Sequence, residues 1–272
     1  MKAMGKAMVL AAGLGTRLRP LTNDRPKALV TIAGRTLLEI TLSRLRTFGV
    51  REVILNVHHF ADQVVAYLAA NQNFGMRIEV SREEVLLDTG GGLKKAAWFF
   101  LESGASAANP LDEPFLIHNV DVLSTIDLTR MAQFHAQHNA LATVAVAERP
   151  TSRLLLFDAH GQLLGRAAAN KAQAMGAPGP SLLGTRDRTN AGDTNSGTAL
   201  AFAGIHVVSP RIFAKLEEEG TFSIIDAYVR LAERGEDVLG FRADGSYWRD
   251  LGRPDDLIAA ERDVTDGTYT AV

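Results

Sequence analysis

Short apolar segments alternate with amphipathic ones through the first 121 residues, and this alternation constrains the fold more than any other feature. The apolar run "AMVLAA" (7–12) ends at Gly13, as expected for a strand that is buried on both faces. The same reasoning predicts strands at 52–57, 76–81 and 114–121, and helices at 36–50, 61–72 and roughly 92–102. Strands that alternate with helices of this length form a mostly parallel sheet. We therefore predict an α/β fold with three layers, in which helices cover both faces of a mixed, mostly parallel sheet.

The second half of the chain has a less regular pattern. It predicts a strand at 140–148, a hairpin over 153–167, a strand at 198–208, a helix at 222–235, and a strand, turn and helix over 246–263. Residues 168–197 have weak periodicity and are predicted to form a long loop, and residues 263–272 a frayed tail. No clear linker divides the chain, so we expect a single domain over 1–272.

Composition excludes several classes of function. The net charge is −2, which argues against a general nucleic-acid binder, because such proteins spread a basic surface widely. The chain has no cysteine, which excludes disulfides, thiolate zinc sites and cysteine nucleophiles. No apolar run is long enough for a signal peptide or a membrane span. We expect a cytoplasmic protein without a membrane partner, and the sequence does not indicate an oligomeric state.

A basic, glycine-rich segment follows the first predicted strand. The stretch "LAAGLGTRLRPLTNDRPKAL" (10–29) places Arg17 two residues after Gly15 and Lys27 directly after Pro26. Glycines allow backbone N–H groups to approach phosphate oxygens, and an arginine with a lysine is a suitable pair for a polyphosphate. A third glycine of the dinucleotide fingerprint is absent, since Leu18 holds that place, and no Gly-Lys-Ser/Thr of a P-loop is present. A local anion site is therefore predicted at the carboxyl end of the first strand.

The motifs together resemble those of sugar-1-phosphate nucleotidylyltransferases, which make nucleoside-diphosphate sugars. The resemblance continues through "TIAGRTLLE", "DTGGG", "NVDV", "AFAGIHVVSP" and "WRDLGRPDDL", so it covers about residues 8–260. It is strongest to short bacterial members such as N-acetylmuramate-1-phosphate uridylyltransferases and mannose-1-phosphate guanylyltransferases. The resemblance implies a Rossmann-like nucleotidyltransferase fold without a C-terminal β-helix. It also implies a nucleotide-binding half over about 1–125 and a sugar-binding half over about 126–262.

The resemblance implies nucleotidyl transfer from an NTP, with UTP or GTP favoured, to a sugar 1-phosphate, with release of pyrophosphate. Such chemistry depends mainly on alignment and on neutralisation of phosphate charge. Arg17 would contact the β- and γ-phosphates, Lys27 would neutralise the reacting phosphates, and Asp121 would complete the catalytic set. The nucleotide would be held by the residues that match the family pattern: Leu10, Ala11, Ala12, Gly13, Gly15, Thr16, Arg17, Lys27, Gly90, Gly91 and Asn119.

The metal and sugar sites are also implied by resemblance. Asp121 and Asp250 would hold Mg²⁺, which often takes one or two protein carboxylates and completes its shell with phosphates and water. The glycines of "DTGGG" (88–92) would let the backbone run along a flat base edge. Gly204 would line the sugar pocket.

The chain departs from the family pattern at two places. Val120 stands where many relatives have glycine before the metal-binding aspartate, and the Glu-Lys-Pro segment that contacts the sugar and its phosphate is absent. A replacement for that lysine is open among four cations: Arg149, Arg153, Arg166 and Lys171.

Two alternative functions remain open at this point. One is a catalytically silent regulator that binds nucleotides or sugars on the same fold, although the chain keeps both cations and both aspartates. The other is a cytidylyltransferase that acts on a phosphorylated amino-alcohol such as phosphocholine, against which the segment "AFAGIHVVSP" argues.

Overall fold

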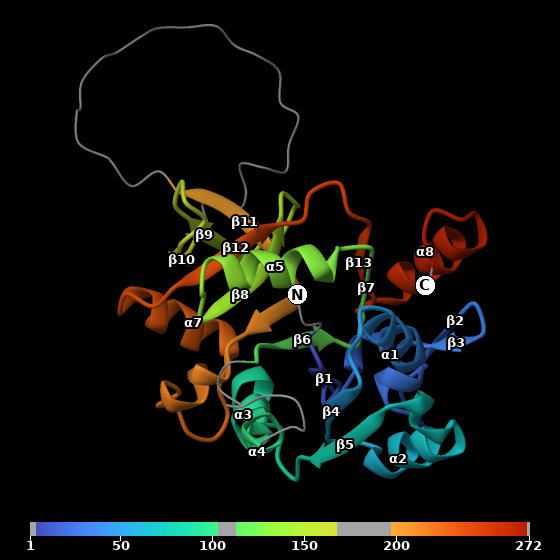
Figure 1. Cartoon of the computed structure of the whole chain (residues 1–272). Helices are drawn as coiled ribbons and strands as arrows, with labels where there is room; N and C mark the ends of the chain where they lie inside the picture. The colour runs from blue at the N-terminus through green and yellow to red at the C-terminus, as the bar shows by residue number, and fades with distance from the viewer. Residues whose placement is uncertain (1–3, 103–112, 168–196, 271–272) are drawn as a thin grey trace, which may run out of the picture.

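A computed structural model describes residues 4–102, 113–167 and 197–270. A nine-stranded sheet forms its centre, with strands in the order β10-β9-β11-β6-β1-β4-β5 and with β8 and β12 joined through β11 (Figure 1). Its strands are β1 (Lys6–Leu10), β4 (Glu52–Val57), β5 (Arg77–Arg82), β6 (Phe115–Asn119), β8 (Ala142–Ala147), β9 (Leu154–Phe157), β10 (Leu163–Arg166), β11 (Thr198–Val208) and β12 (Val238–Arg242). The pairs β1–β4, β1–β6, β4–β5 and β8–β12 are parallel, whereas β11 runs antiparallel to its neighbours. The predicted mixed, mostly parallel sheet is confirmed.

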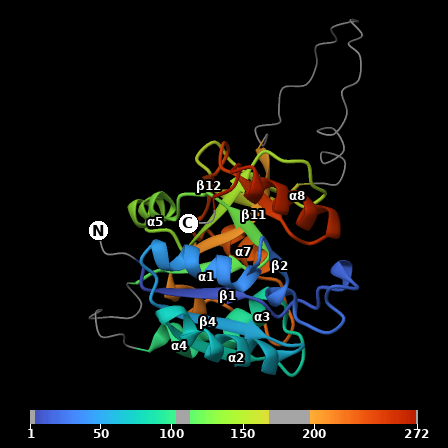
Figure 2. The ribbon, with the colours of Figure 1, turned by 90° about the vertical axis from the view of Figure 1, so that its right-hand side faces the viewer.

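The sheet separates two hydrophobic cores. Alternate residues of β1 enter different cores, with Ala7 and Val9 on one face and Met8 on the other, because successive strand side chains point to opposite faces. The first core receives side chains from α1 (Leu37–Thr47), α2 (Ala61–Ala70), α5 (Leu128–Gln137) and α8 (Pro254–Thr265). The second receives them from α3 (Asp88–Lys95), α4 (Ala97–Leu101) and α7 (Ile224–Glu233). Helices thus cover both faces (Figures 1 and 2), and the three-layer prediction is confirmed.

Two small antiparallel pairs stand outside the central sheet. One joins β2 (Thr31–Ile32) to β3 (Arg35–Thr36), and the other joins β7 (Val122–Ser124) to β13 (Trp248–Asp250). Short 3₁₀ helices complete the described elements: η1 (Thr16–Leu18), η2 (Lys27–Leu29), η3 (Gln72–Gly75) and η5 (Pro210–Ala214). The β7–β13 pair brings the C-terminal part of the chain against the end of β6.

The structure corrects the sequence prediction at two helix boundaries. The helix predicted at roughly 92–102 is two helices, and the first begins at Asp88, inside the "DTGGG" motif. The predicted tail after residue 263 is wrong for its described part: α8 continues to Thr265, and Tyr269 is 2% exposed in the first core. Apolar contact with the core therefore fixes this segment, which has little periodicity of its own. The loop predicted at 168–197 lies, except for Gly197, outside the described residues.

Candidate functional site

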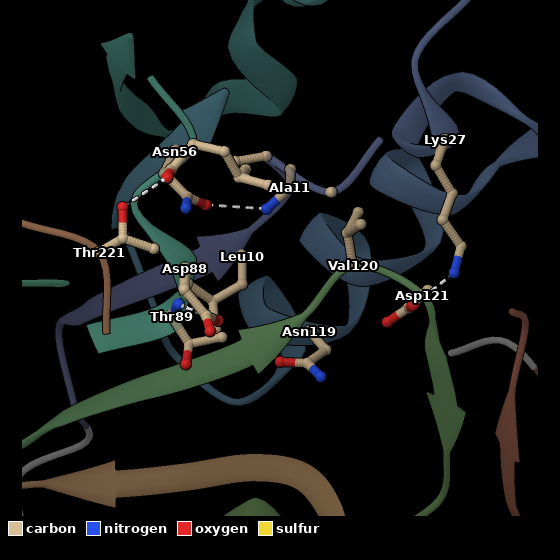
Figure 3. A pocket seen from close by; sticks show the side chains of 13 residues that line it. Leu10, Ala11, Lys27, Asn56, Asp88, Thr89, Asn119, Val120, Asp121 and Thr221 are labelled. Atoms are coloured by element: carbon tan, nitrogen blue, oxygen red, sulfur yellow. Dashed lines mark hydrogen bonds and ion pairs between the residues drawn. The ribbon is translucent and has the colours of Figure 1, made fainter. Parts of the chain in front are cut away.

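A cavity of about 460 Å³ lies at the carboxyl ends of β1, β4 and β6. Sequence-predicted residues Leu10, Ala11, Ala12, Gly13, Lys27, Asn119 and Asp121 line it, together with Asn56, Leu86, Asp88, Thr89, Val120 and Thr221 (Figure 3). This is the edge at which open α/β sheets bind ligands. Gly15 and Thr16 do not belong to this lining; they form the entry to η1, where Gly15 has a left-handed φ of 63°.

Lys27 and Asp121 form an ion pair at one end of the cavity (Figure 3). The lysine side chain is 9% exposed and the aspartate side chain 22% exposed. Pro26 precedes the lysine in extended conformation and η2 begins at Lys27, so a rigid turn carries the ammonium to the site. Two residues separated by 94 positions thus meet, as the resemblance implied.

Asp250 lies next to this pair because β13 is paired with β7. Asp250 is opposite Val122 in the ladder, and the Leu251 N–H donates to the Asp121 carbonyl at 2.8 Å. Burial and the neighbouring Asp121 charge raise the pKa of Asp250, whereas Lys27 and Arg17 oppose the rise. Its Oδ1 atom is buried without a hydrogen-bond partner among the described residues. A carboxylate in this state favours the approach of a cation.

Arg17 approaches Asp250 across Gly252. A Cβ atom on Gly252 would lie 2.7 Å from Oδ1 of Asp250 and 2.8 Å from Nη2 of Arg17. With both groups in these positions a Cβ atom would crowd them, so Gly252 leaves the space in which they lie close together. The structure therefore brings Arg17, Lys27, Asp121 and Asp250 into one cluster. By contrast, Arg25 is exposed and pairs with the adjacent Asp24.

The carboxylates of Asp121 and Asp250 are suitable ligands for a Mg²⁺ ion that substrate phosphates also coordinate. Within the described residues, no group of three or more His, Asp or Glu side chains is arranged to hold a metal. Asp121 and the partnerless oxygen of Asp250 offer the hard oxygen ligands that Mg²⁺ prefers, and two carboxylates suffice when phosphates and water complete the shell.

Asn56 is a site residue that the sequence analysis did not identify. Its side chain is 3% exposed, accepts a 2.8 Å hydrogen bond from the Ala11 N–H and donates one of 2.8 Å to Glu83. The other Glu83 oxygen accepts from the Leu87 N–H at 3.0 Å. This network ties the turn after β1 to the start of α3. The sequence does contain one signal for Asn56: it is a polar residue near the end of the apolar strand "EVILNV".

The contact of Gly90 and Gly91 with the base edge stays a prediction, because both glycines lie outside the lining of the 460 Å³ cavity. Both lie in the first turn of α3. Their N–H groups donate to the Phe222 carbonyl at 2.9 and 3.3 Å. The Thr89 hydroxyl accepts from the Ile224 N–H at 3.0 Å, so it helps to cap α7. These contacts show that the glycines pack α3 against 220–222, while Asp88 and Thr89 face the cavity.

Replacement of Gly91 by alanine is expected to destabilise the fold. The new Cβ would lie 2.2 Å from the Gly220 carbonyl oxygen, which is backbone and cannot turn aside. We expect the free energy of unfolding in urea to fall by about 2–3 kcal/mol. Gly13→Ala is the matched control, because its Cβ would have nothing within 4 Å. Equal stability of the two variants would contradict this packing role.

Asn119 and Gly204 lie in contact across the β6–β11 pair. Gly204 has a φ of 75°, and its Cβ would lie 3.0 Å from the Asn119 amide nitrogen and 2.9 Å from Val122. The register of β11 against β8 shifts between Phe202 and His206, so Gly204 lies in an irregular segment of the strand. Gly204 is outside the lining of the 460 Å³ cavity, and a contact with the sugar stays a prediction.

Comparisons with known proteins identify the family of this chain. The sequence profile of the Nucleotidyl transferase family matches residues 6–155. The N-acetylmuramate alpha-1-phosphate uridylyltransferase of Caulobacter vibrioides is 35% identical over 94% of this chain and 95% of its own length. A mannose-1-phosphate guanyltransferase of Yarrowia lipolytica is 26% identical over 93% of this chain, which spans 62% of that relative.

A solved structure has the same fold. A putative glucose-1-phosphate thymidylyltransferase from Bacillus anthracis superposes with a TM-score of 0.73 at 15% identity, over 97% of both chains. No helix of the described residues is long and apolar enough to cross a bilayer. The family profile covers more than half of the chain, and the Caulobacter relative matches nearly all of it. This chain belongs to the nucleotidyl transferase family.

Proposed function

We propose that this protein transfers a uridylyl group from UTP to a sugar 1-phosphate, with N-acetylmuramate 1-phosphate as the first candidate acceptor. An oxygen of the sugar phosphate forms a bond to the α-phosphorus of UTP. The bond from that phosphorus to the bridging oxygen of the β-phosphate breaks, and pyrophosphate leaves with the electron pair. The 35% identity to the Caulobacter uridylyltransferase over nearly all of both chains supports this choice of base and sugar.

The residues of the charged cluster would divide the work of neutralisation. The turn over residues 10–16 places backbone N–H groups at the nucleotide, while Arg17 contacts the leaving pyrophosphate and Lys27 the reacting phosphates. Repulsion between an anionic attacking oxygen and the triphosphate is the main barrier, so fixed positive charge at this place lowers it. Asn56 fixes the Ala11 N–H, and with it the direction of the turn.

Asp121 and Asp250 would hold Mg²⁺, which supplies further neutralisation of phosphate charge when it is bound. The partnerless oxygen of Asp250 and its raised pKa support this assignment, because a bound cation would satisfy both. We also propose a cytoplasmic location, which a chain without cysteine fits.

The convergence of Arg17, Lys27, Asp121 and Asp250 beside the cavity is the observation that carries the proposal. The test is a matrix of four NTPs against several sugar 1-phosphates with Mg²⁺, in which pyrophosphate release is followed. We expect the highest kcat/KM with UTP and N-acetylmuramate 1-phosphate. The Yarrowia relative makes GTP with mannose 1-phosphate the second pair to examine. Pyrophosphate release without any sugar phosphate, or from none of the pairs, would contradict the proposal.

A further inference from the structure

A partly buried arginine in the second half of the chain has no carboxylate partner among the described residues. Arg149 follows β8, and its guanidinium lies over the Trp248 ring at 3.2 Å from the centroid. Its Nη2 donates to the Phe202 carbonyl at 2.9 Å, while its Nε is buried and has no hydrogen-bond partner in the described ranges. Burial lowers the pKa of Arg149 to about 10, against the opposing charges of Asp250 and Asp244. The side chain is still charged at neutral pH, so an anion beside it would be stabilised.

The acidic residues near Arg149 form ion pairs with another arginine. Arg149 lines a small cavity of about 140 Å³ with Glu148, Asp244 and Trp248 among its neighbours. Arg242 pairs with Glu148 at 2.7 Å and with Asp244 at 2.5 Å. No ion pair therefore joins Arg149 to an acid in the described part of the chain, although its position is fixed by the indole and a carbonyl. A fixed cation with unused hydrogen-bonding capacity is suited to a phosphate.

Strand β13 places this arginine on the same side as the proposed metal ligands. Trp248 and Asp250 are two residues apart on that strand, and such side chains lie on one face. The Asp250 charge acts on Arg149, which agrees with this placement. Trp248 also donates its Nε1–H to the Ala203 carbonyl at 2.8 Å, next to Gly204. Arg149 thus contacts the strand predicted to line the sugar pocket and is close enough to Asp250 for their charges to interact, although it lines the 140 Å³ cavity and not the 460 Å³ one.

The other candidates for the missing lysine fit less well. Arg166 is engaged by Asp226, with Nη2 at 2.5 Å and Nε at 3.1 Å from the same oxygen. Arg153 is exposed and lines neither cavity, and Lys171 lies outside the described residues.

We propose that Arg149, held flat against Trp248, binds the phosphate of the sugar 1-phosphate and positions its oxygen for attack. The guanidinium replaces the lysine of the absent Glu-Lys-Pro segment, and its planar fork gives two N–H donors to one phosphate. The inference rests on the proposed function, since it assigns the acceptor subsite of that reaction.

The test compares Arg149→Gln with the matched control Arg166→Gln. Calorimetry measures N-acetylmuramate 1-phosphate binding to each full-length protein with Mg²⁺ and a non-hydrolysable UTP analogue present, and steady-state kinetics gives both KM values. We expect Arg149→Gln to weaken sugar-phosphate binding and raise its KM about 100-fold, because a charged hydrogen bond is lost. The KM for UTP should change less than about 3-fold, which shows that the fold and nucleotide site persist. Arg149→Lys should recover part of the loss, and Arg166→Gln should behave as the wild type.

Three results would overturn the role of Arg149, the proposed function, or both. Unchanged sugar-phosphate binding in Arg149→Gln would overturn the role of Arg149 and leave the proposed function intact. Wild-type binding that depends on Arg149 but gives no turnover with any NTP would overturn the proposed function and keep the subsite. Failure of the wild type to bind any sugar 1-phosphate would overturn both.

Discussion

Asp250→Asn is expected to abolish turnover while making the metal-free protein more stable. Loss of a ligand for a divalent ion removes several kcal/mol of charge stabilisation, so kcat should fall about 1,000-fold. The stability effect follows from the raised pKa of Asp250: the folded state binds the proton more tightly than the unfolded chain does. The carboxylate therefore destabilises the fold progressively as pH rises from the unfolded to the folded pKa, and fully above it, and the neutral amide removes this penalty.

At pH 7 without metal, we expect the variant to melt at a higher temperature than the wild type. The difference should disappear below the unfolded pKa, where both side chains are neutral. Asp255→Asn is the control, because that exposed residue lies in the first turn of α8. It should keep wild-type turnover and lose only a little stability from the helix terminus. A destabilised Asp250→Asn with normal turnover would contradict both parts of the account.

Lys27→Met is expected to lose both activity and stability. The lysine side chain is 9% exposed, and its removal leaves Asp121 without a partner next to Asp250. We expect kcat to fall about 1,000-fold, because a positioned charge at the reacting phosphates is worth roughly 4 kcal/mol. The free energy of unfolding at pH 7 should fall by about 2 kcal/mol, less than for a fully buried pair because Asp121 is partly exposed.

The double variant Lys27→Met/Asp121→Asn separates the two effects. Removal of the unpaired charge should restore most of the stability by urea unfolding, whereas kcat should stay as low as in the single variant. Arg25→Gln is the control for loss of a cation in the same segment, since Arg25 is exposed and pairs with the neighbouring Asp24. Full activity of Lys27→Met would show that the ion pair is structural and that phosphate neutralisation has another source.

Much of the fold could be predicted because local patterns carry strong signals. β4 and β11 occupy the predicted ranges to the residue, since an apolar strand between turn residues has clear limits. The helix that begins in the "DTGGG" segment was harder to predict from sequence. A run of glycines disfavours a helix, but the packing of Gly90 and Gly91 against 220–222 compensates for that preference. This contact joins positions about 130 residues apart and has no local signature.

The same contrast holds for the site. Resemblance placed Lys27, Asp121 and Asp250 in one group, and the structure brings them together through the β7–β13 pair. Asn56 gave a weaker signal because its function depends on the distant partners Ala11 and Glu83. Arg149 could not be separated from Arg153 and Arg166 by sequence, since only tertiary contact shows which cation has an acid partner and which lies on Trp248.

Manganese binding measures whether Asp121 and Asp250 form one metal site at the nucleotide. Electron paramagnetic resonance can follow Mn²⁺ titrated into the wild type, Asp121→Asn and Asp250→Asn with a non-hydrolysable UTP analogue present. We expect tight binding of one ion by the wild type and a loss of affinity of about 10-fold or more in each variant. Equal Mn²⁺ affinity in all three proteins would contradict this metal site.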